Sequence, residues 1–257
     1  MAGATAPIMK PTPTTAIVDA RRAAGAECAV GGVIIWVASF PRSGNTFPRI
    51  VLKHLYGVRT STVYDVDGVA ERLGSELIGF EERSSSIGEM RASERPHFVK
   101  THRQRAGEED PAICLVRDGR DSITSWARLN GAPDFEAEAR RIIDRREAVG
   151  TGSWGRNVLS RLRPPAPHRV PLRHEDLIRE PRRAVEQAVA ALVPSLRPLP
   201  DARIPTFAEL RQVDGGFFRR GHTGTHADEL PDELHRLFWS RPDNVAAMEL
   251  LGYPRDA

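Results

Sequence analysis

The chain has 257 residues, enough for one α/β domain with a sizeable core or for two small domains. Its net charge is +3, which suits an anionic small ligand, but it contains no long basic block of the kind that binds nucleic acid. No stretch approaches the roughly 20 apolar residues of a membrane-spanning helix, and no secretory signal is visible. We therefore expect a cytoplasmic protein with no membrane or nucleic-acid partner.

Residues 1–32 are rich in Ala, Pro, Thr and Gly, a composition typical of a flexible N-terminal arm. Beyond them, apolar runs alternate with amphipathic segments, which predicts one doubly wound α/β domain over residues 33–257. The expected strands cover 33–39, 97–101, 112–116 and 170–174. The expected helices cover about 48–56, 120–129, 134–148 and 181–192, with two further pieces broken near Pro242. The stretch 58–95 has weak periodicity and is expected to be irregular and partly helical.

The first expected strand leads directly into a turn of small and polar residues, Ser39-Phe40-Pro41-Arg42-Ser43-Gly44-Asn45-Thr46. Strand, small-residue loop and helix form the architecture that surrounds a phosphate with backbone N–H groups and a helix N-terminus. The loop lacks the lysine of a nucleotide-triphosphate loop, because Asn45 follows Gly44. The segment predicts an anion cradle, although a polar turn without a ligand remains the alternative for this segment alone.

Further basic groups follow the next two strands, Lys100-Thr101-His102 and then Arg117. The carboxyl ends of parallel strands form the ligand crevice of an open sheet, so these groups can converge there. Ser125 comes eight residues after Arg117, about two helical turns on, and a second basic loop contains Arg219-Arg220-Gly221. One small anion hardly needs so many cations, so we expect a ligand with two separated phosphates.

Taken in order, these motifs resemble the cytosolic-type sulfotransferases, which use 3′-phosphoadenosine 5′-phosphosulfate (PAPS). The similarity covers the loop at 39–46, Lys100-Thr101-His102, Arg117 with Ser125, and Arg219-Arg220-Gly221. His174-Glu175-Asp176 before Pro181 adds a fifth match. The resemblance spans residues 33–253 and implies a P-loop-like fold. It also implies transfer of a sulfuryl group to a hydroxyl of a small or medium organic acceptor, leaving adenosine 3′,5′-bisphosphate (PAP), without a metal.

The resemblance also implies roles for individual residues. His102 would be the general base, and Arg42, where many members carry lysine, would stabilise charge on the leaving group. Lys100 would be either a second charge stabiliser or a structural neighbour of the loop. The cofactor-binding residues implied are Arg42, Ser43, Gly44, Asn45, Thr46, Phe47, Arg117, Ser125, His174, Thr206, Phe207, Arg219, Arg220 and Gly221.

The chain departs from the family pattern at several positions. Phe47 stands where Trp is frequent, His174 replaces a frequent Tyr, and no Trp follows the Arg219-Gly221 loop. Acceptor identity and oligomeric state, a homodimer included, do not follow from the sequence. Two alternatives stay open: a small-molecule kinase of the same broad fold, which the missing lysine argues against, and a non-catalytic nucleotide-binding protein.

Overall fold

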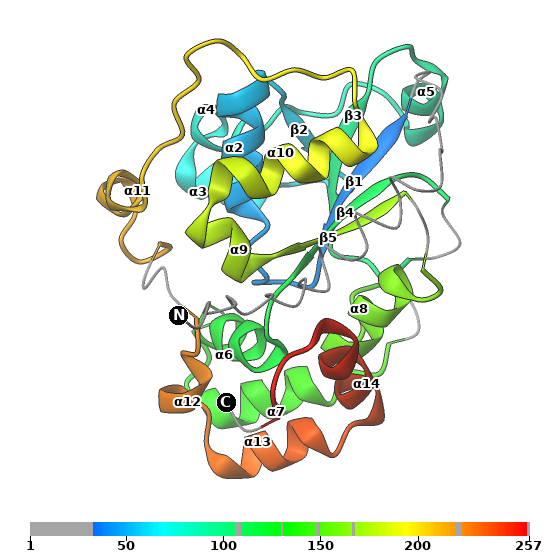
Figure 1. Cartoon of the computed structure of the whole chain (residues 1–257). Coiled ribbons are helices and arrows are strands. Elements are labelled where there is room, and N and C mark those ends of the chain that lie inside the picture. The colour runs from blue at the N-terminus through cyan, green and yellow to red at the C-terminus, as the bar shows by residue number, and fades with distance from the viewer. Residues whose placement is uncertain are drawn as a thin grey trace, which may run out of the picture.

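The computed structural model describes residues 33–105, 109–129, 131–147, 150–165, 168–218 and 223–255. Within these ranges the chain forms a five-stranded sheet in the order β2-β3-β1-β4-β5, with every neighbouring pair parallel (Figure 1). The strands are β1 (Ile34–Ser39), β2 (Thr60–Thr62), β3 (His97–Thr101), β4 (Ala112–Val116) and β5 (Arg169–Arg173). The predicted P-loop-like α/β fold, with helices flanking a central parallel sheet, is confirmed.

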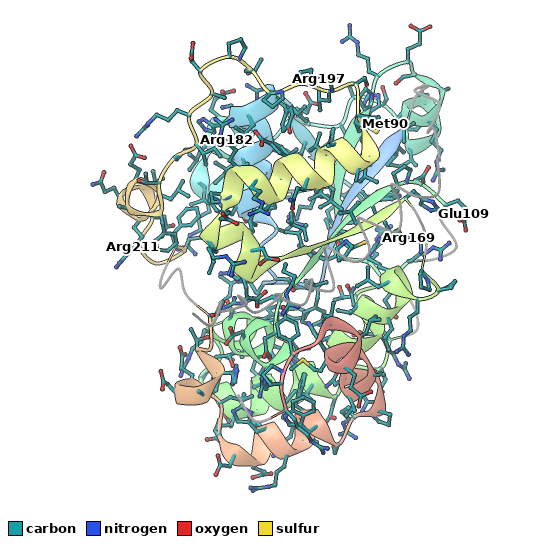
Figure 2. The ribbon with its side chains drawn as sticks, in the orientation of Figure 1. Met90, Glu109, Arg169, Arg182, Arg197 and Arg211 are labelled. Carbon is teal, nitrogen blue, oxygen red and sulfur yellow. The ribbon has the colours of Figure 1, made fainter. Side chains whose placement is uncertain are left out.

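Helices cover both faces of the sheet because its strands are apolar on both sides. On β1, Ile35 and Val37 point into a core shared with α2 (Thr46–Tyr56), α9 (His174–Arg179) and α10 (Pro181–Leu192). Ile34 and Trp36 point the other way, towards Met90 of α5 (Ile87–Ala92), which Figure 2 shows beside the sheet. Alternate residues of β1 thus pack into the two hydrophobic cores on opposite faces of the sheet.

A second group of helices packs below the sheet in the view of Figure 1. It consists of α6 (Gly119–Leu129), α7 (Phe135–Ile143), α8 (Trp154–Leu162), α13 (Asp232–Trp239) and α14 (Pro242–Leu251). Their shared core surrounds Trp154 and Phe238, whose rings lie 5.7 Å apart. The remaining helices are α3 (Gly68–Leu73), α4 (Ser75–Ile78), α11 (Phe207–Val213) and α12 (His226–Glu229).

The structure differs from the expected elements in a few places. The three-residue strand β2 was expected to be irregular, because Thr-Ser-Thr carries no apolar alternation. Helix α2 begins at Thr46, two residues before Pro48, because a proline in the first turn has no intrahelical N–H bond to lose. Helices α8 and α9 were not predicted, and α7 ends at Ile143 rather than near 148. The expected arm at 1–32 lies outside the described residues.

The strand order fixes where a ligand can bind. From β1 the chain builds β2 and β3 on one side of that strand, and then crosses to build β4 and β5 on the other side. The connections diverge between β1 and β4, and a crevice opens at such a switch point at the carboxyl ends of the strands. The loops after Ser39 and Val116 both start there. None of the helices within the described ranges is long and apolar enough to cross a membrane.

Candidate active site

A cavity of about 500 Å³ opens at this edge of the sheet. Its volume is in the usual range for a small-molecule site. Among the described residues, its wall includes five cations and no carboxylate: Arg42, Arg72, Lys100, Arg117 and Arg128. The sequence-predicted residues that line it are Arg42, Gly44, Asn45, Thr46, Phe47, Lys100, His102, Arg117, Ser125, His174 and Phe207. The predicted convergence of basic strand ends is therefore present in the structure.

The loop between β1 and α2 turns sharply at Arg42. The Ser43 N–H donates to the Phe40 carbonyl at 3.2 Å, and Arg42 has φ 64°, a left-handed conformation that is uncommon outside glycine. Such a residue costs on the order of 1–3 kcal/mol and persists where the surroundings hold it. Here Arg42 Nε donates to Ser125 Oγ at 3.2 Å, and the guanidinium carbon lies 4.8 Å from the Phe217 ring centre. The loop thus fixes a cation at the cavity wall.

The side chains of Ser43 and Asn45 anchor the loop to α6 and β1. Ser43 is buried and its hydroxyl lies 3.2 Å from that of Ser122 in α6. Asn45 Nδ2 donates to the Val37 carbonyl at 3.0 Å and to Ser39 Oγ at 3.1 Å. Ser43 is therefore a support beneath the cavity and not part of its wall. Backbone N–H groups at the start of α2 remain at the wall, because Gly44, Asn45 and Thr46 line it.

His102 follows β3 and is half-buried, with its ring oriented by the first strand. Its Nδ1 lies 3.0 Å from the Ser39 carbonyl oxygen, which can only accept, and 3.1 Å from the Ser39 hydroxyl, which can donate or accept. The carbonyl contact favours the tautomer with the hydrogen on Nδ1 and the lone pair on Nε2. The His102 N–H donates to the Tyr64 hydroxyl at 2.8 Å, and the two rings are stacked. Burial, followed by the charge of Lys100, lowers the pKa of His102 to about 3. The imidazole is therefore neutral at physiological pH.

Lys100 belongs to a buried ion-pair network. Its Nζ lies 3.2 Å from Asp67 Oδ2, and the same oxygen accepts from Arg49 NH1 at 2.9 Å. Arg49 and Asp67 side chains are fully buried. Burial lowers the pKa of Lys100, while Asp67 acts in the opposite direction. Lys100 is both a wall residue and a structural neighbour of these groups, so each of its two expected roles remains compatible with its position.

Arg117 and Asp121 form a second buried pair on the β4 side. Arg117 NH1 donates to the Arg42 carbonyl at 3.3 Å and NH2 to Asp121 Oδ2 at 3.4 Å, while its buried Nε has no partner in the described structure. Both bonds are long, so the guanidinium keeps donor capacity for a ligand. The pKa of Asp121 is lowered: burial raises it, but Arg117 and the backbone N–H groups of His226 and Gly224 outweigh burial.

His174, the first residue of α9, lies against Gly44. A Cβ on Gly44 would fall 2.5 Å from His174 Nδ1, and Gly44 has φ 91°, so this position requires glycine. Burial, then the charge of Arg117, lowers the pKa of His174 to about 3. Its buried Nδ1 has no hydrogen-bond partner in the described part of the chain. The neutral ring of His174 thus lines the cavity, and this Nδ1 lies on the side that meets Gly44.

Not every predicted residue reaches the wall. Thr206 is exposed, and its hydroxyl caps α11 by accepting from the Glu209 N–H at 3.3 Å. Arg219, Arg220 and Gly221 lie outside the described residues, so their predicted role stays a prediction.

Sequence reasoning missed other parts of the wall, among them Arg72, Arg128 and Thr225. Arg72 lies on α3, in the stretch expected to be irregular, and no motif marks it. Trp126 also lines the cavity, whereas Trp154 is buried in the helical core.

The described residues contain no cluster of three or more His, Cys, Asp or Glu side chains that could hold a metal ion. Cys114 is a buried free thiol of β4. The described wall of the cavity offers fixed cations, backbone N–H groups and a neutral imidazole. Together they suit the binding of a polyanion next to a proton acceptor.

Comparison with known proteins defines the class of fold. The chain resembles the structure of mouse sulfotransferase SULT7A1 complexed with PAP, with a TM-score of 0.61 over 93% of both chains. Sequence identity is 15%, so this likeness shows that the chain has a sulfotransferase fold and no more. No family model matches the sequence, and no curated protein sequence matches it either.

Proposed function

We propose that this protein is a PAPS-dependent sulfotransferase that transfers a sulfuryl group to a hydroxyl of a small or medium organic molecule. One observation carries the proposal. Cations from the ends of three neighbouring strands, Arg42, Lys100 and Arg117, share a cavity whose described wall has no carboxylate, and His102 stands beside them. The fold of a sulfotransferase that was crystallised with PAP agrees with it.

The residues present fit a nucleotide with two phosphate groups. Arg117 Nε and His174 Nδ1 are buried polar atoms with no partner in the described structure, and such atoms usually have one. A bound nucleotide would supply it. Gly44, Asn45 and Thr46 line the cavity at the start of α2, where the first backbone N–H groups have no intrahelical acceptor and suit an anion. The fit therefore rests on the polar atoms that this fold leaves without partners.

Each wall residue takes a definite part in this proposal. Gly44, Asn45 and Thr46 hold the 5′ group through backbone N–H groups and the threonine hydroxyl. Arg117 and Ser125 hold the 3′-phosphate. The adenine lies among Phe47, His174 and Phe207, aromatic side chains that suit stacking. Thr206, whose hydroxyl caps a helix, contributes at most through its neighbour Phe207.

His102 is the proton acceptor of the proposed reaction. Nδ1–H donates to the Ser39 carbonyl, which leaves the Nε2 lone pair to take the proton of the acceptor hydroxyl. When bound, PAPS supplies the activated sulfuryl group. Arg42 remains charged throughout and acts electrostatically, because its guanidinium does not release a proton at neutral pH. Lys100 contributes a second positive charge, held in place by Asp67.

The proposal is tested by separating binding from turnover. Calorimetry with PAP should show binding to the natural protein, a loss of about tenfold or more for Arg117→Ala, and no change for Arg197→Ala. Arg197 is an exposed control on the connection after α10 (Figure 2). His102→Ala should keep PAP affinity within about threefold but lose about 10²–10⁴-fold in turnover with PAPS and a panel of phenols and sugars.

Absence of PAP binding by the natural protein would overturn the proposal. Full turnover in His102→Ala would remove His102 as the base but leave the rest standing. Binding of PAP without transfer to any acceptor would favour the non-catalytic alternative.

A further inference from the structure

Asp121 accepts from four donors, three of them in one distant segment, yet it is not among the residues that line the cavity. Its side chain is fully buried, in the first turn of α6. Oδ1 accepts from Thr225 Oγ1 at 3.0 Å and from the His226 N–H at 2.9 Å. Oδ2 accepts from the Gly224 N–H at 2.9 Å and lies 3.4 Å from Arg117 NH2. One carboxylate thus joins Arg117 to a segment more than 100 residues away.

These contacts leave Arg117 held on two sides. Its NH1 donates to the Arg42 carbonyl and its NH2 to Asp121, so the guanidinium plane is set by two fixed oxygens. The Arg117 contact is the longest of the four at that carboxylate, since the other three donors lie at 2.9 Å, 3.0 Å and 2.9 Å. Asp121 therefore holds residues 224–226 by short hydrogen bonds and interacts with Arg117 mainly through charge, which is the largest of the effects that lower the pKa of Asp121.

From this arrangement, and resting on the proposed function, we infer that Asp121 is a positioning residue for recognition of the 3′-phosphate. It orients Arg117 and draws Gly224, Thr225 and His226 onto α6, so that Thr225 reaches the cavity wall. The 5′ side of the ligand depends on the loop after β1, which Asp121 contacts only indirectly, through the 3.3 Å bond from Arg117 to the Arg42 carbonyl. Loss of Asp121 should consequently weaken the binding of ligands that carry a 3′-phosphate far more than the binding of those that lack it.

The measurement compares PAP with 5′-AMP, which lacks the 3′-phosphate, by calorimetry on the full chain. Asp121→Asn keeps the shape but removes the charge, and should lower PAP affinity by about tenfold or more. Its 5′-AMP affinity should stay within about threefold of the natural protein's. A merely structural defect would weaken both ligands together. Asp232→Asn, an exposed change in the first turn of α13, is the control and should alter neither affinity.

A milder pair of variants keeps the inference testable if Asp121→Asn does not fold. Thr225→Val removes one hydrogen bond to Asp121, and Thr225→Ser retains it. We expect Thr225→Val to lower the PAP to 5′-AMP affinity ratio by about threefold or more and Thr225→Ser to preserve it.

An unchanged ratio of PAP affinity to 5′-AMP affinity in Asp121→Asn or Thr225→Val would overturn the inference. Tighter PAP binding by Asp121→Asn would overturn it as well. The failure of the proposed function looks different, because then the natural protein itself would not prefer PAP to 5′-AMP.

Discussion

His102 is the residue whose chemistry depends most on its surroundings. With a pKa of about 3, it is neutral and available, but a ring of such low basicity accepts a proton poorly at neutral pH. Burial and the charge of Lys100 lower the pKa of His102. A negative charge placed nearby raises this pKa again, because an anion stabilises the imidazolium. A ligand that places an anion beside His102 is therefore expected to raise its pKa, which in the proposed reaction would make it a better proton acceptor.

This effect can be measured by NMR titration of the His102 ring, assigned with His102→Asn. Without ligand, the ring should stay neutral well below its ordinary pKa of 6.5, and saturating PAP should raise the pKa towards that value. His54, at the far end of α2, should titrate identically in both samples. The same His102 titration curve with and without PAP would contradict the expectation.

At the scale of elements, the site depends on close contact between the loop before α2 and the first turn of α9. Gly44 meets His174 there, and the conformation of Gly44 adds a second constraint, since φ 91° strains any other residue. Gly74, between α3 and α4, has a similar φ of 87°, but a Cβ there would meet nothing within 4 Å. A substitution at Gly74 would thus introduce backbone strain alone, whereas a substitution at Gly44 would introduce strain and a steric clash with His174.

We therefore predict different outcomes for Gly44→Ala and Gly74→Ala. Both should lose about 1–3 kcal/mol of unfolding free energy from backbone strain, measured by urea denaturation. Only Gly44→Ala should also weaken PAP binding, by about tenfold or more, because it displaces the loop or His174. In a His174→Ala background, Gly44→Ala should cost less stability, with a coupling of about 0.5–3 kcal/mol. Equal effects of the two alanines on PAP affinity would show that the contact is unimportant.

Helix α6 links the parts of the site. Ser122 supports the loop through Ser43, Ser125 holds Arg42, and Asp121 holds Arg117 and residues 224–226. The sequence predicted Ser125, because its spacing from Arg117 belongs to a motif. It could not predict Asp121, because the partners of that carboxylate lie far along the chain and only the folded structure brings them together.

At the scale of the whole molecule, one buried carboxylate joins three elements on the β3 side of the sheet. Asp67 caps α3 by accepting from the Val69 and Ala70 N–H groups, and it pairs with Arg49 of α2 and Lys100 of β3. Burial raises the pKa of Asp67, but the two cations outweigh burial and the net shift is downward. Its stabilising contribution is thus present above the ordinary carboxyl value of 3.8 and is lost as the pH falls through the lowered pKa.

Asp67→Asn should accordingly destabilise the protein at pH 7 by about 3–5 kcal/mol, because it leaves two buried cations without their counter-charge. Asparagine can still cap α3, so the loss of unfolding free energy is due to the missing charge and not to a missing helix cap. The measurement is the free energy of unfolding in urea, with exposed Asp65→Asn as the control, expected within about 0.5 kcal/mol of the natural protein. A similarly small change for Asp67→Asn would refute the ion-pair account.

The sequence predicted the fold well where hydrophobic pattern decided it. Strands β3 and β4 and helix α10 have the predicted bounds, since each is an apolar or amphipathic run between clear breaks. It failed for β2, whose pairing with β3 is settled by tertiary contacts. In the site, strand-end cations such as Arg117 were predictable, because parallel strands gather their carboxyl ends. Arg72 was not, because its place at the wall depends on how α3 packs.

The cations at the strand ends have a consequence for how long the folded protein lasts. Arg42, Lys100 and Arg117 line one cavity whose described wall carries no carboxylate, although Asp67 and Asp121 pair with Lys100 and Arg117 from behind that wall. Any polyanion that binds this cavity only in the folded form shifts the folding equilibrium towards the folded chain by mass action. If such a ligand binds, the fraction of the chain that is folded, and with it the resistance to proteolysis, rises with the concentration of that ligand.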